Sequence, residues 1–86
     1  MSTAEIAAVV DDAIAQLAPI VRAHEHNPGR TLAALTGSLN RQIVEGAEYP
    51  DPLTPTEIAE HVVEAYTVLY TGRRPDGSAP FQIPAA

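Results

Sequence analysis

Hydrophobic residues recur every three or four positions in three separate stretches of the chain, which is the spacing of one face of an α-helix. The first stretch spans residues 3–25 and opens with Ser2 and Glu5, at the spacing of a capping box. At about 100° per residue its apolar positions fall within one arc of about 140°. They are Ile6, Val9, Val10, Ala13, Ile14, Leu17, Ile20 and Val21, followed by His24.

Pro19 interrupts this first stretch, but it lies on the face opposite to the apolar arc. A proline removes one backbone hydrogen bond and clashes with the carbonyl four residues earlier, which costs about 3 kcal/mol inside a regular helix. Because the apolar arc keeps its phase across Pro19, we expect one long helix that is kinked there. A break at Pro19 is the alternative.

The second predicted helix spans residues 31–45 and has a narrow apolar face made of Leu32, Leu35, Leu39 and Ile43. A turn at residues 27–30 precedes it, although Asn27 could also cap a helix whose first residue is Pro28. Gly46 is expected to end it. The small residues Ala33 and Gly37 lie one turn apart on a neighbouring face, where another helix could approach closely.

The third predicted helix spans residues 55–71, between the cap signal of Thr54, Pro55 and Glu57 and the stop signal of Gly72. It carries two apolar stripes, which together cover about 160° of its surface. The first stripe is Ile58, Val62, Ala65 and Leu69, and the second is Ala59, Val63, Tyr66 and Tyr70. This exceeds what one side of a three-helix bundle needs, so we expect the helix to be central or shared with another chain.

Residues 73–86 cannot continue the helix, because Pro75, Asp76 and Gly77 predict a turn and Pro80 and Pro84 follow, so we predict an extended, proline-containing tail. Phe81 and Ile83 are two positions apart, so they would point the same way from an extended segment and could anchor the tail. The fold class predicted is therefore all-α: a three-helix bundle over residues 1–72, followed by this tail.

The 86 residues carry a net charge of −6 and include no cysteine, which excludes disulfides and thiolate zinc sites. An acidic chain is poorly suited to bind nucleic acid, because phosphate contacts require clustered bases. No apolar run approaches the roughly 18 residues that span a membrane. The N-terminus also lacks the pattern of a signal peptide, so we expect a cytoplasmic site of synthesis.

Two clusters in the sequence contain histidine, a common metal ligand. His24 and His26 are two positions apart, so on a helix they point about 200° apart and cannot share an ion. His24 continues the apolar arc and is expected to be a half-buried, hydrogen-bonded residue. His61 has Glu57 and Glu64 within a helical turn, which is more typical of a surface ion pair than of a metal centre. No metal or cofactor is predicted.

No nucleophile with a neighbouring base can be assembled from the sequence, and the glycine spacing of a phosphate-binding loop is absent. We therefore predict that the chain is not an enzyme and has no small-molecule substrate. The interpretation that remains is a structural or accessory protein that acts through protein–protein contacts. It would be a homo-oligomer or a small helical subunit of a larger assembly, such as a phage particle or a multi-subunit complex.

The partner-binding residues are expected on the second stripe of the third helix and in the tail, since tyrosine is favoured at protein interfaces. The predicted set is Ala59, Val63, Tyr66, Tyr70, Phe81 and Ile83. The alternative function is an acidic regulator or inhibitor that covers a basic surface of a nucleic-acid-binding protein. The acids that could imitate phosphates are Glu5, Asp11, Asp12, Glu57, Glu60 and Glu64.

Overall fold

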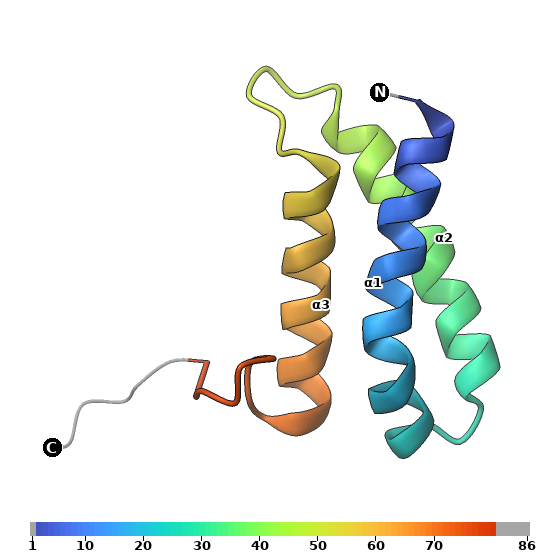
Figure 1. The fold of residues 1–86 in the computed structure, drawn as a ribbon, viewed down its shortest axis with the longest axis vertical. Coiled ribbons are helices and arrows are strands. Elements are labelled where there is room, and N and C mark those ends of the chain that lie inside the picture. Colours follow the sequence, from blue (N-terminus) through green and yellow to red (C-terminus); the bar gives the residue numbers. More distant parts are fainter. Residues whose placement is uncertain (1, 81–86) are drawn as a thin grey trace, which may run out of the picture.

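The structure, a computed structural model, describes residues 2–80 and shows the predicted all-α three-helix bundle. Helix α1 spans Thr3–His24, α2 spans Pro28–Gly46 and α3 spans Pro55–Thr71. Helices α1 and α3 run in the same direction and α2 runs in the opposite one (Figure 1). The predicted tail residues Phe81 and Ile83 lie outside the described residues.

Helix α1 continues through Pro19 without a break, as the unchanged phase of its apolar arc predicts. The Ser2 hydroxyl oxygen accepts the backbone N–H of Glu5 at 3.2 Å, which caps the first turn. The Pro19 ring is exposed, so the carbonyl of Ala15 that it leaves without a helical partner can bond to water. Five side chains are buried on the opposite side of the helix: Val10, Ala13, Leu17, Ala18 and Val21.

Helix α2 begins at Pro28, three residues before the start expected from its apolar pattern. The Asn27 side-chain oxygen accepts the backbone N–H of Arg30 at 3.4 Å, so Asn27 is the N-cap and Pro28 the first helical residue. This is the alternative that the sequence left open. Proline is well suited to this position, because the first N–H of a helix has no partner within the helix.

Helix α3 begins with the complete capping box predicted from its sequence. The Thr54 hydroxyl accepts the Glu57 N–H at 3.2 Å, and the Glu57 carboxylate accepts the Thr54 N–H at 3.1 Å. The pKa of Glu57 is lowered. The largest cause is the bond that its carboxylate accepts from the backbone N–H of Thr54, and the next is hydrogen bonding with the Thr54 side chain. A lowered pKa means that the box stabilises the fold at neutral pH and loses this effect as the pH falls through that pKa.

Removal of this cap is expected to cost about 1 kcal/mol, because Thr54→Ala leaves a helix N–H without its partner. In a domain of this size, the loss corresponds to a melting temperature lower by about 4–8 °C. Thermal unfolding followed by circular dichroism measures it. Thr56→Ala is the matched control, since Thr56 is exposed and two residues away. Equal effects of the two substitutions would contradict a specific role for the cap.

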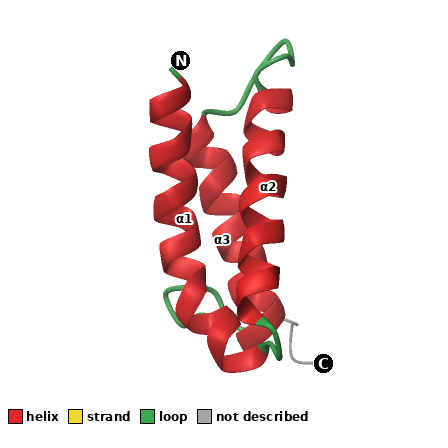
Figure 2. Cartoon of the chain, turned by 90° about the vertical axis from the view of Figure 1, so that its right-hand side faces the viewer, coloured by secondary structure: helices red, strands yellow, loops and turns green. Residues whose placement is uncertain are grey.

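Helix α1 is the centre of the bundle, because it packs against both other helices while α2 and α3 contact each other less. Figure 2 shows α1 and α2 side by side, with α3 behind them. Of the two expectations for α3, the one that made it the central helix is therefore wrong, whereas the one in which its apolar surface is shared with another chain stays a prediction. One core joins the three helices, and its members are Val10, Ala13, Leu17, Val21, Leu35, Leu39, Ile43, Ile58, Ala59 and Val63.

A compact turn follows α3, where an extended segment was expected. Gly72 ends the helix with a φ of 73°, in the left-handed region that glycine adopts without strain. The Gly77 N–H donates to the carbonyl of Arg74 at 2.8 Å, and the Arg74 N–H donates to the carbonyl of Ser78 at 2.9 Å. The turn predicted at residues 75–77 is thus confirmed, and it brings Arg74 back to Glu64 on α3, with their side chains 3.0 Å apart.

Candidate protein-interaction site

Two of the predicted partner-binding residues, Ala59 and Val63, lie inside the bundle. Their exposed fractions are 6% and 7%, and both belong to the core shared by the three helices. The prediction that they form part of an exposed contact surface is therefore corrected. The second stripe of α3 faces its own bundle, because α1 packs against that side of α3 and covers it.

Tyr66 and Tyr70 belong to the same stripe, and both are half-buried against the core. Their ring centroids are 6.5 Å apart in a stacked arrangement. The Tyr70 hydroxyl donates to the carboxylate of Glu25, and this bond is the main cause of the raised pKa of Tyr70. Tyr70 thereby connects the end of α3 to the end of α1, so its contacts are at least partly internal.

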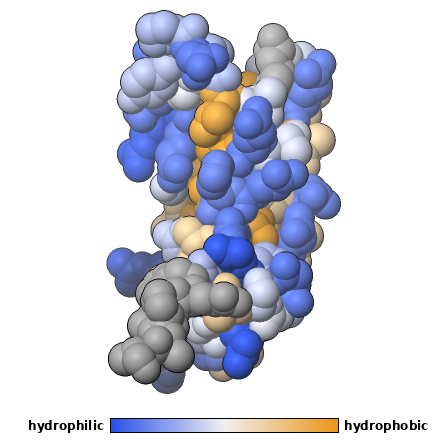
Figure 3. Space-filling model, turned by 90° about the vertical axis from the view of Figure 1, so that its left-hand side faces the viewer, coloured by the Kyte–Doolittle hydropathy of each residue, from blue (hydrophilic) through white to orange (hydrophobic). Residues whose placement is uncertain are grey.

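The other stripe of α3 begins in the core at Ile58, and its later residues are the ones that stay uncovered in the described chain. We call Val62, Ala65 and Leu69 the outer stripe: Val62 is half-buried and Ala65 is exposed, while Leu69 is 71% exposed. These three residues are spaced three and four apart, so they follow one line along the helix. Figure 3, which looks onto the α3 side of the molecule, shows hydrophobic side chains between rows of polar ones.

The outer stripe borders a groove of about 640 Å³ between α2, the loop at residues 47–54 and α3. Two side chains of the loop form its far wall: Tyr49, which is 68% exposed, and Leu53, which is 48% exposed. Ile58, Val62, Ala65 and Tyr66 line the α3 side, and Gln42, Glu45, Asp51 and His61 supply polar atoms. Most side chains that line this α2–α3 groove are therefore apolar.

The sequence favoured the covered stripe over the exposed one because it carries Tyr66 and Tyr70, and it gave no expectation for Thr67. In the structure Thr67 is 6% exposed, and its hydroxyl donates to the carbonyl of Val63 at 2.7 Å. This bond within the helix lets a threonine lie in the core. The buried arc of α3 therefore extends from Ala59 to Thr67, away from Leu69, and a buried threonine at this spacing is the signal that would have indicated it.

A second groove, of about 610 Å³, lies between α1 and α3. Small or branched apolar side chains form its floor: Ala8, Val9, Ala13, Ala59 and Val63. Four carboxylates line it, those of Asp12, Glu60, Glu64 and Asp76, together with the guanidinium of Arg74. The structure thus brings together three of the acids that the sequence suggested as phosphate mimics and adds Asp76 from the turn.

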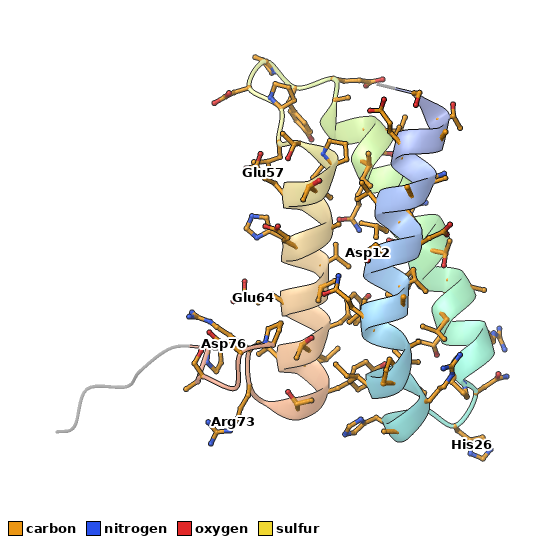
Figure 4. The ribbon with its side chains drawn as sticks, viewed as in Figure 1. Asp12, His26, Glu57, Glu64, Arg73 and Asp76 are labelled. Atoms are coloured by element: carbon orange, nitrogen blue, oxygen red, sulfur yellow. The ribbon has the colours of Figure 1, made fainter. Side chains whose placement is uncertain are left out.

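The histidines show no arrangement for metal chemistry. The Nδ1 atom of His24 lies 2.9 Å from the carbonyl of Ile20, and its ring lies 5.6 Å from that of Tyr70. His24 is exposed, so the expected half-burial is wrong, whereas its hydrogen bond is confirmed. His26 points away from the bundle after α1 ends (Figure 4). Within residues 2–80, no three histidine, aspartate or glutamate side chains converge as a metal site would require.

The face of α2 that carries Ala33 and Gly37 is exposed, and a side chain added at Gly37 would meet no atom within 4 Å. Among the described residues, no helix is long and apolar enough to cross a membrane. The candidate interaction features are therefore the two grooves that flank α3. Comparison of the chain with known protein families, curated proteins and solved structures finds no match in any of the three.

Proposed function

We propose that this chain is a non-enzymatic helical subunit that acts through protein–protein contacts, and that its outer stripe binds a second copy of the chain. The observation that carries the proposal is the exposure of Leu69, 71%, in line with Val62 and Ala65 beside an apolar groove. Single exposed leucines are common on monomers, but a continuous apolar stripe beside a groove is typical of an interface.

A second copy fits this surface because the outer stripe can pair with itself across a two-fold axis. Val62, Ala65 and Leu69 follow one line along α3, so an antiparallel copy presents the same line in reverse order. In an antiparallel pair, a two-fold axis between residues 65 and 66 places Val62 beside the second copy's Leu69. The same antiparallel arrangement pairs the two helix dipoles favourably.

The net charge of −6 opposes self-association at low ionic strength, since two acidic chains repel each other over long distances. At 0.15 M salt the repulsion between exposed charges is screened beyond about 8 Å, while the burial of apolar side chains is unaffected. A dimer of this kind should therefore form more readily at moderate salt than at low salt. The same surface would also serve a helical subunit within a larger assembly, such as a phage particle.

Leu69→Glu is expected to abolish the dimer, because it places a carboxylate against the second copy's Val62 at both symmetric ends of the apolar contact. Sedimentation velocity over a range of micromolar concentrations should show a dimer for the natural chain and a monomer for the variant. The expected weakening is at least about 100-fold, or roughly 3 kcal/mol. Circular dichroism should show unchanged helix content, since Leu69 contributes little to the core.

The matched control is Val44→Glu, which also places an acid at an exposed apolar position. Val44 is 51% exposed on α2 and does not line either groove, so this variant should associate like the natural chain. A natural chain that stays monomeric at every concentration would overturn the self-association proposal. Equal weakening by both substitutions would also overturn it, because that would indicate a general effect of charge.

A further inference from the structure

The groove between α1 and α3 differs from the α2–α3 groove in its charge. Its four carboxylates and one guanidinium give it a net charge of about −3 if all are ionised, half of the −6 of the whole chain. Figure 4 shows three of the carboxylates coming from different elements: Asp12 from α1, Glu64 from α3 and Asp76 from the turn. The charge is therefore gathered by the fold and not by neighbouring positions in the sequence.

Local hydrogen bonds hold these acids in place. The Asp12 carboxylate accepts the side-chain amide of Gln16 at 3.1 Å, and Glu64 is paired with Arg74 at 3.0 Å. The hydroxyl and the backbone N–H of Ser78 both donate to Asp76, and these bonds lower the pKa of Asp76. Asp76 is therefore ionised at neutral pH, and the turn that carries it forms one end of the groove.

Between these acids the floor of the groove is formed by small apolar side chains. Ala13 and Ala59 are buried, with exposed fractions of 1% and 6%, and their small side chains leave the hollow between the two helices. Ala8 is exposed at the rim of the floor. The lining residues of α1 run from residue 8 to residue 16 and those of α3 from 56 to 64. At 1.5 Å per residue, either span is about 12 Å long, which is about two turns of a helix.

We propose that this groove binds a basic amphipathic segment of another protein, about two helical turns long. The apolar side chains of the segment lie on the alanine and valine floor, and its lysine or arginine side chains reach Asp12, Glu60 and Asp76. Such a segment matches both properties of the groove, whereas a nucleic acid would bring its phosphates against four carboxylates. The site lies on the opposite flank of α3 from the outer stripe, so it is independent of self-association.

The test measures binding of a synthetic peptide of 18 residues, with leucine and alanine on one helical face and lysine on the other. Fluorescence anisotropy of the labelled peptide reports its affinity for the full chain. Two control peptides separate the causes of binding: one with the same composition in scrambled order, and one with glutamate in place of lysine. Both are expected to bind at least about tenfold more weakly, since the site requires both charge and an apolar face.

Two variants of the chain test where the peptide binds. Ala8→Leu places a larger side chain at the rim of the floor without changing the charge, and should weaken binding at least about tenfold because the peptide can no longer lie against the floor. The double variant Asp12→Asn with Glu60→Gln should weaken it about fivefold, as expected for two partly exposed charge pairs. The control for Ala8→Leu is Ala34→Leu, at an exposed position on α2. The control for the double variant is Asp11→Asn with Glu45→Gln, which removes the same charge outside this groove. Both controls should stay within about twofold of the natural chain.

Equal binding of the scrambled peptide would overturn the proposal, because attraction by net charge alone would then explain the affinity. Normal binding to the Ala8→Leu variant would overturn it as well, and so would an effect of the control pair as large as that of Asp12→Asn with Glu60→Gln. Melting curves of every variant show that the fold is kept. Repeating the measurement in the Leu69→Glu background separates the two proposals, since that monomer should bind the peptide with unchanged affinity.

Discussion

Leu17→Ala is expected to lower the free energy of unfolding by about 3–5 kcal/mol, because the side chain is fully buried in the helix that contacts both others. A small domain has a total stability of roughly 0.05–0.15 kcal/mol per residue, which is about 4–13 kcal/mol for this chain. The loss is thus between about a quarter and the whole of the stability. The alanine leaves a cavity at the centre of the bundle, where neither α2 nor α3 can close it without losing contact with α1.

Urea unfolding followed by circular dichroism measures this loss as a lower transition midpoint. Val44→Ala is the control, because it also removes methyl groups but at a position that is 51% exposed. Its effect should stay within about 0.5 kcal/mol. A cost below about 1 kcal/mol for Leu17→Ala would contradict the central position of α1 in the core.

Pro19→Ala is expected to stabilise the chain by about 2 kcal/mol, which is an unusually large gain for one exposed position. The alanine supplies an N–H to the carbonyl of Ala15 and removes the clash of the proline ring, together worth about 3 kcal/mol in a helix interior. The unfolded chain becomes more flexible when a proline is lost, which offsets about 0.4–1 kcal/mol of this gain. The melting temperature should rise by about 10 °C.

Pro28→Ala separates this effect from a general effect of proline removal. Pro28 is the first residue of α2, where its missing N–H costs nothing. Alanine at this position should leave the stability unchanged or lower it by less than about 1 kcal/mol. A destabilising Pro19→Ala would contradict this expectation, because it would mean that proline at this position helps α1 to fit between its neighbours.

The ends of the helices could be predicted from the sequence because each depends on a few adjacent residues. The Thr54–Glu57 capping box and the glycine stop at Gly72 appear as expected. The start of α2 was less certain, since Asn27 and Pro28 are suited both to a turn and to a cap. The continuity of α1 through Pro19 followed from the phase of its apolar arc, which depends on many residues and not on one.

The candidate interaction surfaces were harder to predict, because they depend on how the helices lie against one another. Two neighbouring stripes on α3 have similar hydrophobicity, and only the position of α1 makes Val63 internal and Leu69 external. Tyr49 and Leu53 gave no periodic signal, since they lie in the loop that precedes α3. The acid-lined groove combines residues from α1, α3 and the turn, which lie up to 68 positions apart in the chain.

The central position of α1 also determines which helix two copies of the chain could exchange with each other. Helices α1 and α2 form a hairpin, and α3 is held mainly by α1, so the loop at residues 47–54 joins α3 to the hairpin but contributes little to the core. An α3 from another copy would satisfy the same contacts with α1 as the helix it replaces. Opening of this one loop would therefore convert two separate bundles into an intertwined pair in which each hairpin holds its neighbour's third helix.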